Sequence, residues 1–423
     1  MSTSETRLPR PRGEHLHRPG TPGFRRLNLA MGLAGLAAFG MLYTTQPLLP
    51  ELSEAFAVGP TTASLTLSVC TGLLALLVVP ATALGQRWGR PRTMGVALLV
   101  AAVLTLASAV APTFAVLLVL RALTGAALAA VVGVAMGHVG VEVHPSGLAT
   151  AMGLYVAGNS LGGVGGRLIT SAVVDVSSWR WAMAALGLAA LAATAAFWRL
   201  LPAATATSYD AAGEPAPTRT RAYRELLTDP AMLAVLLIPF VLMGGFVATY
   251  NYLAFRLTAA PFSLPAAVVG LVFVTYLSGT ASSALAGRAA NRVGRGRVLL
   301  GSVVVMGAGL ALTLPDHLVL VVVGLLVLTA GFFGAHSVAS GWAPVVGRRH
   351  PSQASALYVC AYYVGSSVFG ALVGLSWRAG AWPATVASVG ALVAVGLVAS
   401  LVVVTRVRPV AGDRRPELAP AVP

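Results

Sequence analysis

Charged residues are scarce in this sequence, and lysine is absent. Only 10% of the 423 residues are charged, whereas 57% are hydrophobic and the mean hydropathy is +0.82. A soluble domain normally has about 25% charged residues, so the composition excludes an ordinary soluble domain and predicts a membrane protein. All 28 basic residues are arginine, against 13 acidic residues. They fall mostly in loops, where arginine orients helices and meets lipid headgroups, so we expect no nucleic-acid partner.

Cysteine is nearly absent too, which limits the covalent and metal chemistry available. Cys70 and Cys360 each lie inside an apolar segment, as is typical of small buried side chains rather than of a disulfide or a metal site. The chain also lacks a Ser/His/Asp set in one compartment, metal-ligand spacing and a phosphate-binding glycine loop followed by lysine. The sequence therefore predicts a protein that is not an enzyme, not driven by ATP, and without metal or cofactor.

A short arginine-rich stretch occurs twice, at residues 84–92 and 289–297. The matching positions are 205 residues apart and carry an amide, two arginines and a glycine: Gln86, Arg87, Gly89 and Arg90 in the first copy, and Asn291, Arg292, Gly294 and Arg295 in the second. A repeat on this scale predicts two related halves, because solenoids repeat every 20 to 50 residues or so.

Twelve apolar segments of about 20 residues follow one another, each long enough to cross a hydrocarbon core of about 30 Å. In the first half they span about 27–49, 61–82, 93–111, 113–137, 148–173 and 180–201. In the second half they span about 231–256, 265–287, 298–315, 317–343, 354–377 and 382–405. The predicted fold is all-α and integral to the membrane, with two pseudo-symmetric six-helix bundles over residues 27–201 and 230–406.

Arginine counts predict how these helices are oriented. If both ends of the chain are cytoplasmic, the cytoplasmic segments hold 23 arginines and the outer segments 3, and the other 2 lie within helices. The positive-inside rule therefore places both termini in the cytoplasm. Residues 1–26 are expected to be a disordered tail, 202–229 a mobile linker with a short interfacial helix near 223–227, and 407–423 a second tail.

Motifs in several segments resemble those of the major facilitator superfamily. Residues 84–92 are similar to its Gly-x-Leu-Ala-Asp-Arg-x-Gly-Arg-Arg loop, with Gln86 in place of the aspartate. Residues 121–125 (RALTG) are similar to its Arg-x-x-Gln-Gly motif, and residues 47–50 (PLLP) to the Pro-x-x-Pro of its drug exporters. The glycine-rich run 155–167 resembles the antiporter motif without its proline. The resemblance covers residues 27–406 and implies a 12-helix secondary transporter of the efflux type.

Two roles are open for the arginine turns. Glycine permits a tight reversal and arginine can meet the carbonyls at helix C-termini, which would make each turn a latch that gates the cytoplasmic side. The alternative is that the arginines only fix the topology. We favour the latch, and expect it to be weak because Gln86 and Asn291 stand where the resembled family has an acid.

The segment 148–173 carries two stripes at helical spacing. One is made of glycines that allow close helix packing: Gly158, Gly162 and Gly166. The other is largely polar: Tyr155, Asn159, Gly163 and Arg167. An amide and a guanidinium at this depth are costly unless they face a cavity or a partner. Asn159 and Arg167 are therefore candidate cavity residues, with interhelical hydrogen bonding as the alternative for Asn159.

Three further sets of residues are candidates for a substrate cavity. Arg121 lies about 12 Å into the segment 113–137, where an arginine costs at least about 2.5 kcal/mol, so we expect it to be functional rather than a structural ion-pair partner. Tyr43 and Gln46 share a helix face, and adding 205 to 46 gives Asn251, next to Tyr252. Two amides related by pseudo-symmetry suit a central site, although aromatic anchors and one interhelical hydrogen bond would also explain them.

Aromatic residues form another stripe in the segment 354–377, with Tyr358, Tyr362 and Ser366 at helical spacing and Tyr363 beside them. A cavity wall and simple packing explain this stripe equally well. His336, near the inner end of the segment 317–343, is either a hydrogen-bonded packing residue or a proton site.

None of the 13 acidic residues lies deep in an apolar segment. Cationic-drug exporters of the resembled family commonly place a carboxylate in the first helix, and this chain does not. Arg121 and Arg167 are thus left without a buried acidic partner, and each must use backbone carbonyls, hydroxyls, an end carboxylate such as Glu51, or a ligand. This favours a neutral or anionic substrate. The remaining candidate proton sites are Glu51, Asp175 and His336.

The resulting interpretation is a monomeric secondary transporter of the bacterial inner membrane. It would export a small organic compound across the lipid bilayer, with protons as a candidate coupling ion. An uptake transporter for a small metabolite and a non-transporting membrane sensor or scaffold remain alternatives, because a fold does not determine a function.

Overall fold

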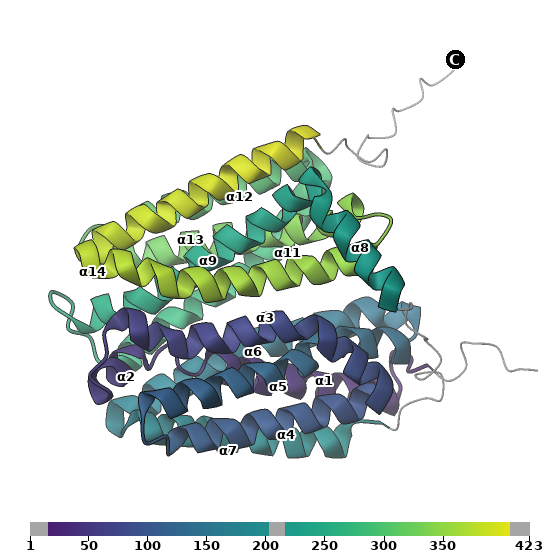
Figure 1. The fold of residues 1–423 in the computed structure, drawn as a ribbon, viewed down its shortest axis with the longest axis horizontal. Helices are drawn as coiled ribbons and strands as arrows, with labels where there is room; N and C mark the ends of the chain where they lie inside the picture. The colour runs from purple at the N-terminus through teal and green to yellow at the C-terminus, as the bar shows by residue number, and fades with distance from the viewer. Residues whose placement is uncertain (1–15, 203–215, 407–423) are drawn as a thin grey trace, which may run out of the picture.

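The described part of the chain forms two stacked bundles of helices (Figure 1). The structure is a computed structural model that describes residues 16–202 and 216–406. The predictions made for residues 1–15, 203–215 and 407–423 lie outside the described residues. The lower bundle in Figure 1 comes from the first half of the chain and the upper one from the second half, as the repeat predicts.

The helices of the two bundles follow the chain in order. The first bundle contains α1 (Pro22–Tyr43), α2 (Leu49–Ala55), α3 (Pro60–Trp88), α4 (Arg90–Ala109), α5 (Phe114–Glu142), α6 (Pro145–Val176) and α7 (Trp179–Leu200). The connecting helix α8 (Ala216–Thr228) leads into α9 (Pro230–Thr258), α10 (Ala266–Leu271), the 3-10 helix η2 (Val272–Thr275), α11 (Tyr276–Val293), α12 (Arg295–Leu312), α13 (Leu318–Val346) and α14 (Pro351–Arg406).

Within the described ranges, ten helices are long and apolar enough to cross a membrane. This count treats α14 as one helix, although its backbone breaks at Gly380 and Ala381 into two spans. It also omits the 32-residue α6, whose glycines and polar residues lower its hydropathy. Dividing α14 and including α6 gives the predicted twelve. The predicted fold class is confirmed.

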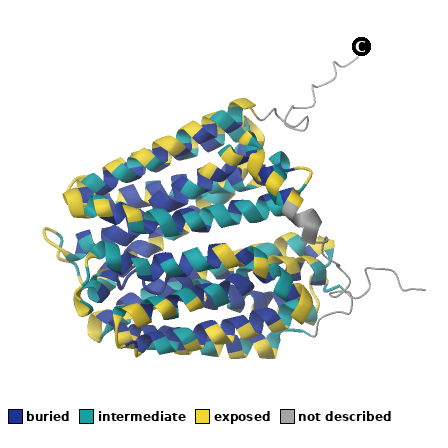
Figure 2. Cartoon of the chain, in the orientation of Figure 1, coloured by how far each residue is buried: buried dark blue, intermediate teal, exposed yellow. Residues whose placement is uncertain are grey.

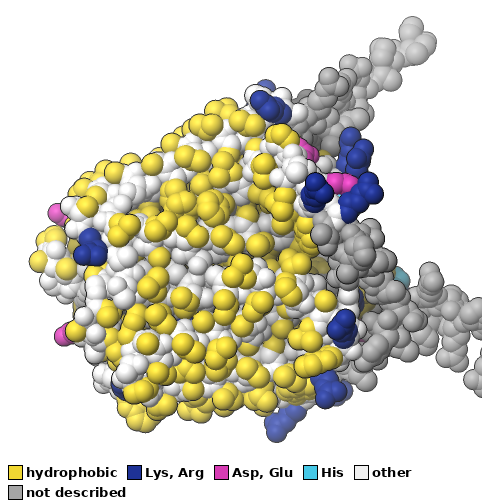
Figure 3. All heavy atoms as spheres, in the orientation of Figure 1, with side chains coloured by type: hydrophobic (Ala, Val, Ile, Leu, Met, Phe, Trp, Pro, Cys, Tyr) yellow, Lys and Arg dark blue, Asp and Glu magenta, His cyan; other side chains and the backbone are white. Residues whose placement is uncertain are grey.

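The outer surface of both bundles is apolar, because it faces lipid. Large hydrophobic side chains stand exposed along the helices, among them Leu76 at 65% and Leu285 at 60% exposure. Figure 2 shows buried residues concentrated inside each bundle, and Figure 3 shows charged side chains mainly at the two ends of the molecule. A soluble protein rarely exposes an apolar patch of this extent.

The first predicted helix was wrong at both ends. The segment 27–49 was expected to be one span, but α1 runs from Pro22 to Tyr43 and a separate short helix begins at Leu49. Thr21 caps the start of α1 by accepting a hydrogen bond from the backbone N–H of Phe24 at 3.3 Å. Near the end of the apolar run, Pro47 offers no backbone N–H to continue the helix and disfavours helical geometry at the residue before it.

The disordered tail predicted for residues 1–26 is also wrong for its last part. The backbone N–H of His17 donates to Glu142 O at 2.9 Å, and the N–H of His144 donates to His17 O at 3.1 Å. These bonds hold the described N-terminal segment against the connection between α5 and α6. In the linker, the helix expected near Tyr223–Leu227 is present as part of α8. Glu225 on α8 bonds His350 at 3.1 Å and so holds α8 against the second bundle.

Both arginine turns have the same backbone geometry. Gly89 joins α3 to α4 with a φ of +85°, and Gly294 joins α11 to α12 with a φ of +93°. Residues other than glycine rarely adopt such angles, which explains why the repeat keeps glycine at both places. We call the end of the molecule that carries these two turns the basic end, and the opposite end the far end. Helix α8 also lies at the basic end (Figure 1).

Close packing of α6 on α1 depends on the predicted glycine stripe. A Cβ at Gly158 would overlap the backbone of Gly32, and one at Gly162 would overlap the backbone of Leu36. One at Gly166 would come within 2.7 Å of Gly40 Cα. The stripe therefore packs helix against helix, as predicted.

We predict that Gly162→Ala destabilises the protein while Gly165→Ala does not. The methyl group at position 162 would press on the α1 backbone, whereas a Cβ at Gly165 meets nothing within 4 Å. Such overpacking typically costs about 1–3 kcal/mol. Thermal unfolding of the purified variants in detergent measures the difference. Equal melting temperatures for the two variants would show that the α1–α6 contact tolerates separation.

Candidate functional site

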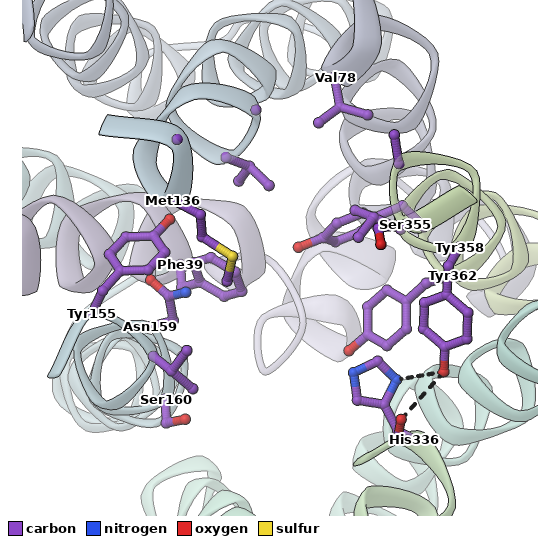
Figure 4. A pocket seen from close by; sticks show the side chains of 18 of the residues that line it. Phe39, Val78, Met136, Tyr155, Asn159, Ser160, His336, Ser355, Tyr358 and Tyr362 are labelled. Carbon is purple, nitrogen blue, oxygen red and sulfur yellow. Dashed lines mark hydrogen bonds between the residues drawn. The ribbon is translucent and has the colours of Figure 1, made fainter. Parts of the chain in front are cut away.

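A cavity of about 730 Å³ lies between the two bundles. From the first bundle, its wall includes Phe39 and Tyr43 of α1, residues 78–82 of α3, residues 132–137 of α5 and the polar stripe of α6. From the second bundle, it includes Tyr276 of α11, Phe333 and His336 of α13 and residues 352–363 of α14. In Figure 4, Tyr155 and Asn159 face Tyr362 and His336 across this space.

The cavity extends towards the basic end. Tyr223 of α8 contributes to its wall, together with Ser352 at the start of α14 and Gly137 near the end of α5. Thr82, which lies seven residues before Gly89 in α3, is in the wall as well. All four residues belong to the parts of their helices nearest the basic end.

At the far end, side chains from the two halves bond to each other. Gln46 Nε2 donates to Asn251 Oδ1 at 2.8 Å, and Asn251 Nδ2 donates to Gly370 O at 3.3 Å. Gln46 and Asn251 are fully buried and are the two amides related by the 205-residue offset. The pseudo-symmetry therefore places equivalent side chains in direct contact where the halves meet.

Helices α3 and α14 form a seam between the halves. Near the far end, the hydroxyl of Tyr252 donates to Ser64 Oγ at 3.2 Å. Further along, Ser367 Oγ donates to Ser68 O at 2.6 Å, and Gly72 packs against Ser367. Tyr252 belongs to α9, whereas the contacts between α3 and α14 themselves are made by small residues, so these two backbones can approach closely.

A second seam joins α6 to the second bundle at the far end only. Asp175 Oδ1 accepts a hydrogen bond from the backbone N–H of Ala267 at 3.3 Å, and Ser171 packs against Gly270. Further towards the cavity, Arg167 contacts the hydroxyl of Tyr276 at 3.4 Å. The α6 residues that line the cavity lie between positions 155 and 167, on the basic-end side of these contacts.

Arg167 lies where the cavity meets the far-end contacts. Its Nε donates to Gln46 Oε1 at 2.8 Å, and Nη1 donates to Gly163 O at 2.7 Å. The guanidinium also lies over the rings of Tyr43, Phe273 and Tyr276, with 4.2, 4.9 and 4.7 Å between Cζ and the ring centroids. Cation–π contacts of this kind stabilise a charge that is removed from water.

Six of the predicted site residues line the cavity: Tyr43, Asn159, Arg167, His336, Tyr362 and Tyr363. His336 Nδ1 is 3.1 Å from the hydroxyl of Tyr358, as the dashed line in Figure 4 shows. Its ring also packs against Tyr362. Asn159 Oδ1 is buried with no hydrogen-bond partner among the described residues.

Arg121 is not in the cavity wall, contrary to our expectation. It is fully buried, and it donates to Thr66 O at 3.3 Å, Met41 O at 3.0 Å and Leu42 O at 2.8 Å. These carbonyls belong to α3 and to the end of α1. The guanidinium therefore joins three helices where α1 stops, and its cost is offset by carbonyl oxygens in place of a carboxylate.

Three other predicted cavity residues lie behind the wall in this conformation. Gln46, Asn251 and Tyr252 are fully buried in contacts between the halves, so the alternative of an interhelical hydrogen bond describes the two amides here. The candidate proton sites Glu51 and Asp175 belong to far-end elements, α2 and the end of α6. Only His336 among the proton candidates reaches the cavity.

The residues of the arginine turns lie at the surface of the basic end. Arg90 Nη1 donates to Gly137 O of α5 at 3.2 Å, which is the predicted arginine-to-carbonyl contact within the first half. Gln86 and Asn291 are exposed, and Gly294 and Arg295 partly buried. Arg87 and Arg292 are exposed and have no hydrogen-bond or ion-pair partner in the described part of the chain.

Sequence reasoning missed several aromatic members of the wall. Phe39, Tyr223, Tyr276 and Phe333 line the cavity but belong to none of the motifs or stripes that we singled out. Tyr276 had a detectable signal, since it follows an apolar run and sits among small polar residues (YLSGTASS) that suit an interior helix face. The aromatic stripe of the segment 354–377 was noted, and Tyr358 of that stripe is in the wall.

The wall is apolar and aromatic with a positive charge. Among the described residues that line the cavity, nine are Phe or Tyr, one is Arg, one is His and none is Asp or Glu. A cavity with mostly aromatic lining and few polar groups is typical of a site for a small organic molecule.

Two pseudo-symmetric helix bundles around a central cavity, bonded to each other at one end, define the class as a membrane transporter of the secondary type. Comparison with known proteins gives the family. The profile of the Major Facilitator Superfamily matches residues 31–273, and the chain belongs to this family.

Two bacterial relatives resemble the chain over almost all of their length. The Inner membrane transport protein YnfM of Escherichia coli (strain K12) is 41% identical over 391 residues, covering 92% of this chain and 91% of that protein. The MFS-type transporter YybF of Bacillus subtilis (strain 168) is 38% identical over 395 residues, covering 90% of this chain and 94% of that protein.

Solved structures share the fold at low sequence identity. The nucleoside transporter NupG matches with a TM-score of 0.76 at 13% identity, covering 89% of this chain and 99% of that one. A bacterial homolog of the human lysosomal transporter Spinster, described as inward-facing and occupied, matches with a TM-score of 0.73 at 15% identity, covering 95% and 100%. These likenesses show the fold and say nothing of the substrate.

We predict that Arg121→Lys lowers stability more than Arg180→Lys does. Lysine has its three N–H donors on one nitrogen, so it cannot span the carbonyls on two helices that the three guanidinium nitrogens of Arg121 reach. A hydrogen bond to a charged group contributes about 1.5–3 kcal/mol, so a loss on the order of 2–4 kcal/mol is expected. Arg180 is the control, because it also donates to two carbonyls, Ala109 O and Ala111 O, but at the exposed far end. Chemical unfolding in detergent compares them; an Arg121→Lys protein of normal stability that loses only ligand binding would restore the cavity role.

Proposed function

We propose that the protein exports a small organic compound, neutral or anionic, from the cytoplasm of a bacterial cell. The observation that carries this proposal is the asymmetry of the cavity. It extends to the basic end, whereas at the far end the halves are joined by Gln46, Asn251 and the two seams. A cavity of this form accepts its ligand from one side of the membrane.

The distribution of arginine supports a cytoplasmic basic end. Both arginine turns, α8 and the described ends of the chain lie there, and the positive-inside rule assigns such an end to the cytoplasm. On this assignment both termini are cytoplasmic in the inner membrane, and the cavity faces inward. The charge of the wall supports the substrate class, because Arg167 favours an anion and none of the described residues of the wall is an acid that could hold a cation.

Transport by alternating access requires a second state in which the basic end closes and the far end opens. In our proposal the turns at residues 84–92 and 289–297 are the latches of that state. Arg87 and Arg292 are exposed in this conformation, as expected for latch residues when the latch is open. Their carbonyl partners would come within reach as the halves approach at the basic end.

We further propose that proton movement drives export, with Glu51 as the first candidate carrier. Burial raises the pKa of this carboxyl from its ordinary value, and its Oε2 is buried without a partner among the described residues. A raised pKa allows a carboxyl to take up a proton closer to neutral pH. Glu51 lies at the far end, which on this assignment faces the outer side of the membrane. The cell pumps protons to that side, so Glu51 would take them up there. Asp175 and His336 are the other candidates.

The experiment that tests export is flux in proteoliposomes. Protein oriented with its basic end outside should take up an added organic anion into the liposomes, and an inside-acid pH gradient should accelerate uptake. Accumulation only in the reverse direction would favour an uptake transporter. Ligand binding without any flux would favour a membrane sensor.

In the same assay, we predict that replacing Arg87 and Arg292 together by Ala slows flux at least about ten-fold. Neither side chain has a bonding partner among residues 16–202 and 216–406, so their loss should leave folding and insertion intact. It should weaken only the state that they latch, by about the worth of one charge-assisted hydrogen bond. The control is Arg348→Ala with Arg349→Ala, which removes the same charge from exposed positions after α13. Normal flux in the latch variant would leave the turns with a topological role only.

A further inference from the structure

The part of the cavity nearest the far end has unsatisfied hydrogen-bonding capacity on Arg167. A guanidinium has five N–H donors. Three of those on Arg167 have acceptors, namely Gln46 Oε1, Gly163 O and the hydroxyl of Tyr276. The last of these is the longest, at 3.4 Å. Two donors therefore remain on a side chain that is 1% exposed and borders the cavity.

Buried charged donors without acceptors are unfavourable, so a ligand that supplies acceptors here is stabilised. A carboxylate has two oxygens at a spacing that suits two N–H donors of one guanidinium. A dianion such as a phosphate monoester would need a second cation. Within the described ranges the wall has no other arginine, so the charge of the site fits a monoanion.

The surroundings of Arg167 determine what the rest of the ligand should be. Tyr43 and Tyr276 lie against its guanidinium, and both belong to the cavity wall. Tyr362 packs edge-on against Tyr363 across from α6, with 5.1 Å between ring centroids. A flat ring that enters between these side chains gains offset and edge-to-face contacts worth about 0.5–1.5 kcal/mol each beyond area burial. An alkyl chain gains only the burial.

We propose that the cavity binds an aromatic monocarboxylate, with its carboxylate on Arg167 and its ring among Tyr43, Tyr276, Tyr362 and Tyr363. The volume of about 730 Å³ leaves room for one or two fused rings with substituents, since pockets for such ligands measure roughly 300–1,000 Å³. This assignment rests on the proposed function and narrows its substrate class from a neutral or anionic compound to an aryl carboxylate.

A ligand bound to Arg167 would also affect the contacts between the two halves, because Arg167 bonds Gln46. Gln46 accepts from Arg167 and donates to Asn251, so one amide side chain serves both partners. A carboxylate that draws the guanidinium towards the cavity weakens its bond to Gln46. The free amide then holds Asn251 less firmly, which favours separation of the halves at the far end.

The decisive comparison uses the unaltered protein in detergent at pH 7 and isothermal titration calorimetry. The probes are 2-naphthoate, its uncharged analogue 2-naphthamide and the non-aromatic anion decanoate. We expect 2-naphthoate to bind at least about ten-fold more tightly than 2-naphthamide, which loses one charged hydrogen-bonded contact. We expect a similar margin over decanoate, which keeps the charge but loses the ring contacts. Equal affinity for naphthoate and naphthamide overturns the role of Arg167, and equal affinity for naphthoate and decanoate overturns the aromatic assignment.

Two variants test the position of the carboxylate. Arg167→Lys should weaken 2-naphthoate binding about ten-fold or more and leave 2-naphthamide binding within two-fold or so. Arg180→Lys is the matched control, because Arg180 also combines carbonyl bonds with a cation–π contact, to Trp179, but lies outside the cavity wall. Wild-type affinity for 2-naphthoate in Arg167→Lys overturns the proposal. If Arg167→Lys does not fold, Tyr43→Leu should reduce the preference for 2-naphthoate over decanoate, and an unchanged preference overturns it too.

The calorimetric result separates this inference from the proposed export. Discrimination by charge and ring supports the binding site even if proteoliposomes show no flux, in which case export alone fails. Flux of other compounds with no such discrimination leaves export standing and removes the aryl carboxylate assignment.

Discussion

A hydrogen bond between two amide side chains, Gln46 and Asn251, joins the two halves of this protein at the end where the cavity is closed. It crosses from one half to the other at a length of 2.8 Å, between positions that the internal repeat makes equivalent. Because both groups are fully buried, neither has water as an alternative partner, and breaking the bond requires a replacement for each. Gln46 also holds Arg167, which borders the cavity. The contact between the halves at the far end and the charged group of the cavity wall are therefore parts of one chain of hydrogen bonds.

The same requirement for buried partners explains the positions of two other arginines, Arg121 and Arg256. In a membrane interior every polar group must be satisfied within the protein. Arg121 meets this requirement with carbonyls at the end of α1, and Arg256 with the carbonyls of Leu314 and Pro315 and the carboxylate of Asp316. The loop that Arg256 holds, between α12 and α13, corresponds in the first half to the loop between α4 and α5, which Arg180 of α7 holds. Each half thus secures the same loop with an arginine from a different helix.

The sequence predicted the fold and the relation between the halves, but it did not predict how individual polar groups are paired. The offset of 205 residues identified Gln46 and Asn251 as equivalents, because duplication preserves spacing. It could not show that they touch, since this depends on how the bundles are tilted. Arg121 was wrongly placed in the cavity wall, because a buried arginine requires a partner but the sequence does not identify that partner. Backbone carbonyls occur at every residue, so no sequence motif marks the ones that Arg121 bonds. Pro47 was a signal that α1 ends before residue 49, but the apolar run continues through it and we predicted one helix. Tyr276 was missed because it follows η2 and η2 interrupts the helical period.

In the proposed cycle of alternating access, the Gln46–Asn251 hydrogen bond keeps the far end closed, and removing that bond tests this proposal most directly. Spin labels at the exposed positions Glu54 and Ala260 report the far end, and labels at Trp88 and Val293 report the basic end, in a cysteine-free background. Double electron–electron resonance measures both distances with and without Asn251→Ala. Alternating access predicts that this substitution lengthens the far-end distance and shortens the basic-end distance in the same population. A far-end distance that grows while the basic-end distance stays constant, or no change in either, would contradict the coupling between the two ends.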